Sequence, residues 1–110
     1  MRHKIKVIVL ESAQSDYRKI KSYVTHQFGT QTWQAINGEW QKKIKKLAVD
    51  PDLGTNMTEL DGTGFVGFKK YQHKNALVVY HCTDQLLTIY MFIPSMRDFR
   101  RHLMARLLDA

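Results

Sequence analysis

The strongest folding signal in the chain is the stretch "LVVYHCTDQLLTIYMFI", residues 77–93, which reads as two consecutive β-strands. β-Branched and aromatic residues dominate both halves, and the short turn at residues 83–85 has a length that joins antiparallel strands. Side chains alternate between the two faces of a strand, which places Leu77, Val79 and His81 on one face and Val78, Tyr80 and Cys82 on the other. Both faces are largely apolar, so both must be covered.

The segments on either side of this hairpin extend the pattern. Residues 65–71 predict a third strand, and the three strands should pair antiparallel in chain order. After the hairpin, Pro94 ends the hydrophobic run, and Ser95 can cap a last helix with Asp98 three residues later. The apolar stripe of that helix would consist of Phe99, Leu103 and Leu107.

Helical periodicity dominates the first half of the chain, after a short β-branched run at residues 5–10 that predicts a strand. Ser12 marks the start of a helix that ends at Gly29, and Thr30 or Thr32 can cap a second helix that stops before Pro51. The two helices should pack as an antiparallel hairpin, because the connection between them is short. Their apolar stripes are Ala13, Tyr17, Ile20, Val24 and Phe28, and Trp33, Ile36, Trp40, Ile44 and Leu47.

The expected order is therefore strand, helix, helix, three strands, helix. This order predicts an α+β domain in which a three-stranded antiparallel meander carries the two-helix hairpin on one face. The C-terminal helix or a partner protein would shield the second face. Because the chain has 110 residues, of which 44% are hydrophobic, it can bury one core, and residues 1–110 are expected to form a single domain.

The charge balance is strongly basic, with 17 Lys and Arg against 10 Asp and Glu and a formal charge of +7. Such a surface attracts polyanions, which include nucleic acid, an anionic membrane and an acidic protein partner. Charge alone does not choose among these partners.

Cysteine and hydropathy patterns indicate a soluble cytoplasmic protein with no membrane partner. The single cysteine, Cys82, excludes an internal disulfide and suits a reducing cytosol. The apolar run at residues 7–10 is too short for a signal peptide, and no segment approaches the roughly 20 apolar residues of a membrane span. The five histidines lack the spacing of metal ligands, so we expect no metal and no cofactor.

Three segments together resemble the RelE/ParE superfamily of bacterial toxins, which are small basic proteins encoded with an antitoxin. The segments are "ESAQSDYRKIKSYVTHQFG", "LAVDPDLGTNMTEL" and "LVVYHCTDQLLTIYMFIPSMRDF", and their order is more specific than any one of them. The resemblance implies a RelE/ParE-like fold, the toxin role in a type II toxin–antitoxin pair, and a cognate acidic antitoxin as partner.

Two activities occur in this superfamily, and the residues here match neither fully. RelE-like members cut messenger RNA in the ribosome without a metal, whereas ParE-like members poison DNA gyrase. The arginine that RelE-like members carry before "VVY" is absent, since Leu77 stands there. Arg97 matches the basic residue after the last strand, but Leu103 occupies the position of the expected tyrosine or histidine, and His102 would substitute only if the helix shifts.

The resemblance and the strand pattern together define a candidate site. His81 shares a face with Leu77, and the usual strand rise puts it about 13 Å from the vacant arginine position. Lys69 and Lys70 resemble phosphate-holding lysines on the preceding strand. The candidate catalytic residues are His81, Arg97 and His102, and the candidate nucleic-acid-binding residues are Lys69, Lys70, Arg100 and Arg101.

Each candidate has a structural alternative. Arg97, Arg100 and Arg101 would then form a solvated helix face, and His81 would be a core histidine. On the sequence alone, a metal-independent endonuclease acting on nucleic acid ranks first, with mRNA at the ribosome favoured over DNA as its substrate. Inhibition of DNA gyrase ranks second, and a non-catalytic basic nucleic-acid-binding module ranks third.

Overall fold

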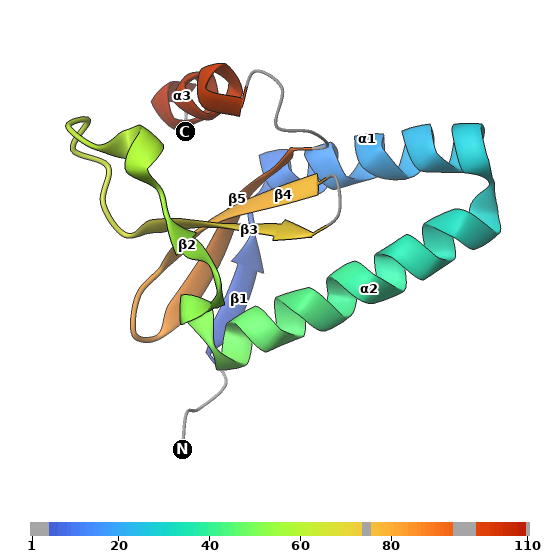
Figure 1. Cartoon of the computed structure of the whole chain (residues 1–110), viewed down its shortest axis with the longest axis horizontal. Coiled ribbons are helices and arrows are strands. Elements are labelled where there is room, and N and C mark those ends of the chain that lie inside the picture. The colour runs from blue at the N-terminus through green and yellow to red at the C-terminus, as the bar shows by residue number, and fades with distance from the viewer. Residues whose placement is uncertain (1–4, 74–75, 94–98, 110) are drawn as a thin grey trace.

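The computed structural model describes residues 5–73, 76–93 and 99–109, and Figure 1 shows their arrangement. Strands and helices follow in the expected order, with short additional elements between α2 and β3. The elements are β1 (Lys6–Val9), α1 (Glu11–Phe28), α2 (Thr30–Val49), η1 (Pro51–Leu53), β2 (Thr55–Asn56), η2 (Thr58–Leu60), β3 (Phe68–His73), β4 (Ala76–Cys82), β5 (Leu86–Ile93) and α3 (Phe99–Asp109).

The strands form one five-stranded sheet in the order β1-β5-β4-β3-β2. β3, β4 and β5 pair antiparallel, which confirms the predicted meander. β1 pairs parallel with β5, and the two-residue strand β2 adds an antiparallel edge to β3. Neither pairing follows from the sequence, since strand patterning identifies a strand but not its neighbour.

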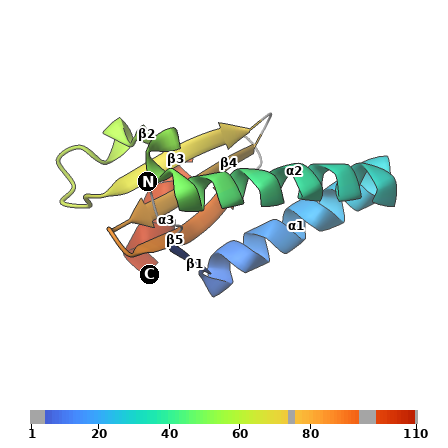
Figure 2. The ribbon, with the colours of Figure 1, turned by 90° about the horizontal axis from the view of Figure 1, so that it is seen from below.

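The helical hairpin covers one face of the sheet, as expected. Figure 2 shows α1 and α2 side by side across this face, with α3 on the far side. Trp40 and Leu47 from α2 pack against Val78 and Tyr80 of β4, and all four side chains are buried. Tyr17 of α1 completes the contact between the layers through rings of α2 and β5, with centroids 5.2 Å from Trp33 and 4.9 Å from Phe92.

A second apolar cluster covers the opposite face, where the sequence analysis left the C-terminal helix and a partner protein as alternatives. Leu103 of α3 is fully buried against the sheet, so the chain itself supplies this cover. The segment around η2 contributes as well, because Met57 and Leu60 are 5% and 3% exposed. The remaining buried members are Leu77, Val79, Met91 and Ile93.

A register shift in the β4–β5 ladder changes the alternation of β5. Val79 pairs with Met91 but Tyr80 pairs with Ile89, so Tyr90 is an extra residue on β5. Tyr90 and Met91 consequently both contact the α3 side of the sheet, while Ile89 and Phe92 pack on the hairpin side.

Several element ends differ from the predictions. α1 begins at Glu11 rather than at Ser12, and α2 begins at Thr30. The predicted threonine cap of α2 is wrong: Gly29 precedes the helix, no side chain caps it, and the Thr32 hydroxyl donates to the Phe28 carbonyl at 3.1 Å. Gly29 does end α1 as predicted, with a φ of 94° that favours glycine.

The third strand starts later than predicted, at residue 68 rather than 65. Gly64 and Gly67 have φ values of 86° and 81°, which interrupt the extended backbone before β3 begins. The proposed helix cap at Ser95 with Asp98 lies outside the described residues.

Candidate functional site

His81 lies on the same sheet face as Leu77, as the strand alternation predicts. The structure places this face opposite the helical hairpin, and the imidazole is part of an aromatic cluster. Its ring centroid is 5.0 Å from that of Phe68, its partner across the β3–β4 ladder. Phe68 in turn lies 5.0 Å from Tyr90 and 6.2 Å from Phe65. Gly67 lies directly against the imidazole, since a Cβ there would come within 2.8 Å of Nε2. The half-buried histidine is therefore held by packing against its neighbours.

Leu77 occupies the position where RelE-like members carry an arginine, and it is buried core. Its side chain is 2% exposed and belongs to the cluster that Leu103 of α3 closes. A guanidinium at this position would lose its hydration without gaining an ionic partner from the apolar neighbours. The centre of this sheet face is thus packed rather than open.

The two candidate lysines point to opposite faces of β3. Lys70 pairs with Val79 and shares the face of His81, whereas Lys69 pairs with Tyr80 and faces the other way. The Lys69 ammonium donates to Asn56 Oδ1 at 2.8 Å and lies 4.0 Å from Asp52. Lys69 therefore ties β2 and η1 to β3, and the structure does not bring it together with His81.

The C-terminal candidates are only partly described. Arg97 lies outside the described residues, while Arg100, Arg101 and His102 fall within the first turns of α3. The side chains of Arg100 and His102 are likewise outside the described part of the chain. Arg101 is exposed, which agrees with a solvated helix face.

An ion pair that the sequence analysis missed links α1 to α3. Arg106 Nη2 donates to Asp16 Oδ1 at 2.8 Å, and Arg106 Nη1 donates to Asp16 Oδ2 at 2.9 Å. The same Oδ2 accepts the backbone N–H of Phe92 at 3.2 Å. The hydrogen bonds from the Asp16 carboxylate raise the pKa of the Arg106 guanidinium further above its ordinary value.

Two buried or half-buried tyrosines hold loop and helix positions. The Tyr80 hydroxyl donates to the Pro51 carbonyl at 2.6 Å and accepts the Gly54 N–H at 3.1 Å. Burial raises the pKa of Tyr80 to about 12, and burial likewise raises that of Tyr17, whose hydroxyl donates to Asn37, to about 12. Both phenols are therefore structural donors at neutral pH.

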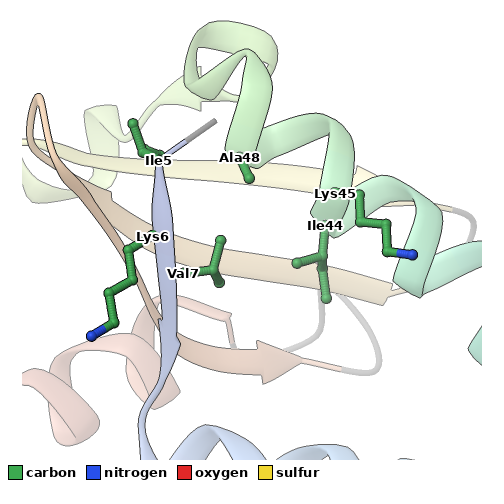
Figure 3. Close-up of a pocket in the computed structure, with 6 residues that line it drawn as sticks. All are labelled: Ile5, Lys6, Val7, Ile44, Lys45 and Ala48. Atoms are coloured by element: carbon green, nitrogen blue, oxygen red, sulfur yellow. The ribbon is translucent and has the colours of Figure 1, made fainter. Parts of the chain in front are cut away.

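A groove lies between β1 and α2 and has a volume of about 430 Å³. Figure 3 shows Val7 and Ile44 facing each other across it, with Lys6 and Lys45 extending away to either side. No sequence pattern indicates this groove, because it depends on how far apart a strand and a helix are placed. Its lining residues are Ile5, Lys6, Val7, Ile44, Lys45 and Ala48.

The excess positive charge of the sequence lies in its first half. Residues 1–49 contain ten Lys and Arg against three Asp and Glu, whereas residues 50–110 contain seven of each. Two of the three acids in the first half are engaged, Asp16 with Arg106 and Glu39 with His73 at 3.2 Å. The excess charge therefore belongs to the part of the chain that forms β1 and the helical hairpin, rather than to the basic C-terminal segment.

Metal ligands and membrane spans are absent from the described ranges. Within residues 5–73, 76–93 and 99–109, no three His, Cys, Asp or Glu side chains gather where they could hold a metal ion. None of the helices in the described part of the chain combines the length and apolar character that crossing a bilayer requires.

Comparisons with known proteins agree with this architecture. Residues 7–99 match the family model of the ParE toxin of the type II toxin–antitoxin system parDE. A solved structure of a chromosomal ParDE toxin–antitoxin system from P. aeruginosa is similar in fold, with a TM-score of 0.67 at 10% sequence identity. That similarity covers 84% of this chain and 98% of the matched chain. No curated protein matches the sequence.

Proposed function

The chain belongs to the ParE family of toxins from type II toxin–antitoxin systems, and on that premise we propose that it inhibits DNA gyrase. The family implies a cognate antitoxin that neutralises the toxin. Gyrase inhibition needs a surface that engages another protein, whereas ribonuclease action needs a proton-transfer site of its own. The arrangement of the described residues supports the first requirement better than the second.

The observation that carries the proposal is the burial of Leu77. RNA cleavage without a metal requires cations beside the reacting phosphate, and this position on the sheet is 2% exposed and surrounded by aliphatic side chains. His81 is packed against Phe68, and Lys69 lies on the opposite face of the sheet. This arrangement favours a structural role for the sheet face.

The helical hairpin provides the surface that a protein target would bind. Figure 1 shows that the turn between α1 and α2 lies far from the sheet. Near this turn, Tyr23 and Phe28 are 61% and 63% exposed, and their ring centroids are 6.5 Å apart. Exposed aromatic pairs of this kind often anchor protein interfaces, because they bury a large area at low entropic cost.

The test compares the two toxin activities directly. The purified chain is added to gyrase with supercoiled DNA, and in parallel to a translation reaction with a defined message. We expect inhibited supercoiling or accumulated cleaved DNA, and intact message. His81→Ala should retain this activity, whereas the double variant Tyr23→Ala with Phe28→Ala should lose it while melting at the temperature of the parent.

A different outcome would favour the nuclease. If messages are cut while gyrase works normally, and if His81→Ala or Arg97→Ala abolishes toxicity, the gyrase proposal fails. Separate labelling of DNA and protein synthesis in expressing cells gives the same distinction in vivo, because the inhibited process stops first.

A further inference from the structure

The groove between β1 and α2 lies along an edge of the sheet. β1 is the outermost strand on this side, and β5 pairs with only one of its edges. An edge strand presents unpaired N–H and C=O groups, which form a template for another extended segment. The hydrogen bonds around β1 identify which of these groups remain accessible.

Alternate residues of β1 direct their backbone groups toward and away from β5. The N–H of Leu10, which directly follows β1, donates to the Ile89 carbonyl at 3.1 Å, so even-numbered residues face β5. Ile5, Val7 and Val9 consequently face outward. Two of these three residues have one outward group already bonded: the Ile5 N–H donates to the Ala48 carbonyl at 3.0 Å, and the Val9 carbonyl accepts from Gln14 Nε2 at 3.0 Å.

Val7 lies between Ile5 and Val9 on this edge, and its outward N–H and C=O border the groove. The walls beside this pair are apolar, since Ile44 and Ala48 of α2 line the groove opposite Val7. A volume of about 430 Å³ lies within the usual range of binding pockets and is open to an extended chain. The site thus combines a backbone donor and acceptor with hydrophobic walls, which is what strand addition requires.

The charge around the groove specifies the kind of segment. Lys6 and Lys45 border it, and Lys42 and Lys46 are exposed within one turn of Lys45 on α2. The groove lining contains no acidic residue. An acidic segment therefore gains from the local field, whereas a second copy of this basic chain would be repelled.

We propose that a short extended segment of an acidic antitoxin binds in this groove and pairs with the free edge of β1 through the N–H and C=O of Val7. The inference rests on the antitoxin partner that family membership implies, and it adds the binding site. Pairing at Val7 would engage both outward backbone groups of the residue at the centre of the edge, and an apolar side chain of the segment would fill the space beside Ile44.

Amide hydrogen exchange tests the pairing without any substitution. The chain is coexpressed with the small acidic protein encoded beside it, and exchange is measured in the free chain and in the purified complex. The Val7 amide should exchange at least about tenfold more slowly in the complex, as expected for a newly formed hydrogen bond. The Leu10 amide, already bonded to Ile89, serves as the internal control.

Substitutions test the same contact independently. Val7→Pro removes the outward N–H and keeps a small apolar side chain in the groove wall, and proline is tolerated on an edge strand when its missing donor faces solvent. We expect Val7→Pro to weaken antitoxin binding about tenfold or more, and Val7→Thr, which keeps the N–H, to weaken it much less. Lys45→Glu should also weaken binding, whereas Lys21→Glu, an equal charge change on exposed α1, should not. Thermal melting confirms that each variant folds.

Three results would overturn the proposal. These are unchanged Val7 exchange in the complex, equal antitoxin affinity of Val7→Pro and the parent, or Val7 protection that grows with the concentration of the free chain. The last result would assign the groove to a second copy. Gyrase inhibition is measured on the free chain, so a chain that fails to inhibit gyrase but protects Val7 in its complex would refute only the proposed target.

Discussion

Asp16 on α1 and Arg106 on α3 form a bidentate ion pair, with N–O distances of 2.8 and 2.9 Å. The pair lies beside the C-terminal part of β5, with which β1 does not pair. β1 ends at Val9, opposite Ile89, and the Phe92 N–H further along β5 is satisfied by Asp16 Oδ2 instead. One carboxylate therefore completes the sheet edge and fastens the C-terminal helix.

This relationship predicts unequal effects of the two alanine variants. Asp16→Ala should lower the free energy of unfolding by about 1–3 kcal/mol, because both Arg106 and the Phe92 N–H lose their acceptor. Arg106→Ala should cost less, since Phe92 keeps its bond. Arg101→Ala, at an exposed site on the same helix, should change stability by less than about 0.5 kcal/mol. Urea unfolding of the three variants, and of the double variant Asp16→Ala with Arg106→Ala, measures the coupling energy between Asp16 and Arg106. Strictly additive losses of stability would contradict this coupling.

The raised pKa of Tyr80 predicts that the folded protein loses stability at alkaline pH. The pKa of Tyr80 in the folded protein is about 12, above the ordinary tyrosine value of 10.0, so the unfolded chain releases the proton first. The stabilisation is present below pH 10 and is lost as the pH rises toward 12. Tyr17 adds to this effect, because its pKa is also about 12. Unfolding measured from pH 8 to 12, with phenolate absorbance followed in parallel, checks the prediction.

Tyr80→Phe separates the hydrogen bonds from the titration. At neutral pH this variant should lose about 1–3 kcal/mol, because the Gly54 N–H and the Pro51 carbonyl lose their shared partner. Above pH 10 its stability should fall less steeply than that of the parent. Equal slopes for the two proteins would show that Tyr80 does not cause the alkaline loss.

Two glycines offer a matched comparison. A Cβ on Gly54 would clash with the Tyr80 hydroxyl and lie 2.8 Å from the Lys70 carbonyl, so Gly54→Ala should destabilise the fold by about 1–3 kcal/mol. Gly38 is inside α2 with nothing within 4 Å of the same position, so Gly38→Ala should stabilise it by about 0.5–1 kcal/mol. Melting temperatures that shift in the same direction would refute this reading of the packing.

The burial of Leu77 predicts the effect of introducing the arginine that RelE-like members carry at this position. Leu77→Arg places a charge in a cluster closed by Leu103 and should cost more than about 3 kcal/mol without creating ribonuclease activity. Leu77→Met, which conserves volume and polarity, should cost less than about 1.5 kcal/mol. A stably folded arginine variant that cuts RNA would show that this face opens as a catalytic cleft.

The local sequence patterns were sufficient for the helices, the meander and the face on which His81 lies. Apolar spacing of three and four residues specifies which side of α2 carries Trp33, Trp40 and Leu47, and strand alternation separates Leu77 from Val78. These features depend on neighbours within a few residues along the chain. The same alternation puts the neighbouring residues Lys69 and Lys70 on opposite faces of β3, so the prediction that groups them in one site is wrong.

Several contacts join segments far apart in the chain, and only the tertiary structure decided them. Asp16 and Arg106 are 90 positions apart, and no local pattern connects them. The parallel pairing of β1 with β5, and the groove that it leaves beside α2, depend on how the hairpin returns the chain across the sheet. Periodicity indicates which side of a helix or strand is buried, because the spacing of apolar residues within that element decides which side the hydrophobic effect buries. The choice of partner depends on packing and hydrogen bonds that exist only after the chain has closed on itself.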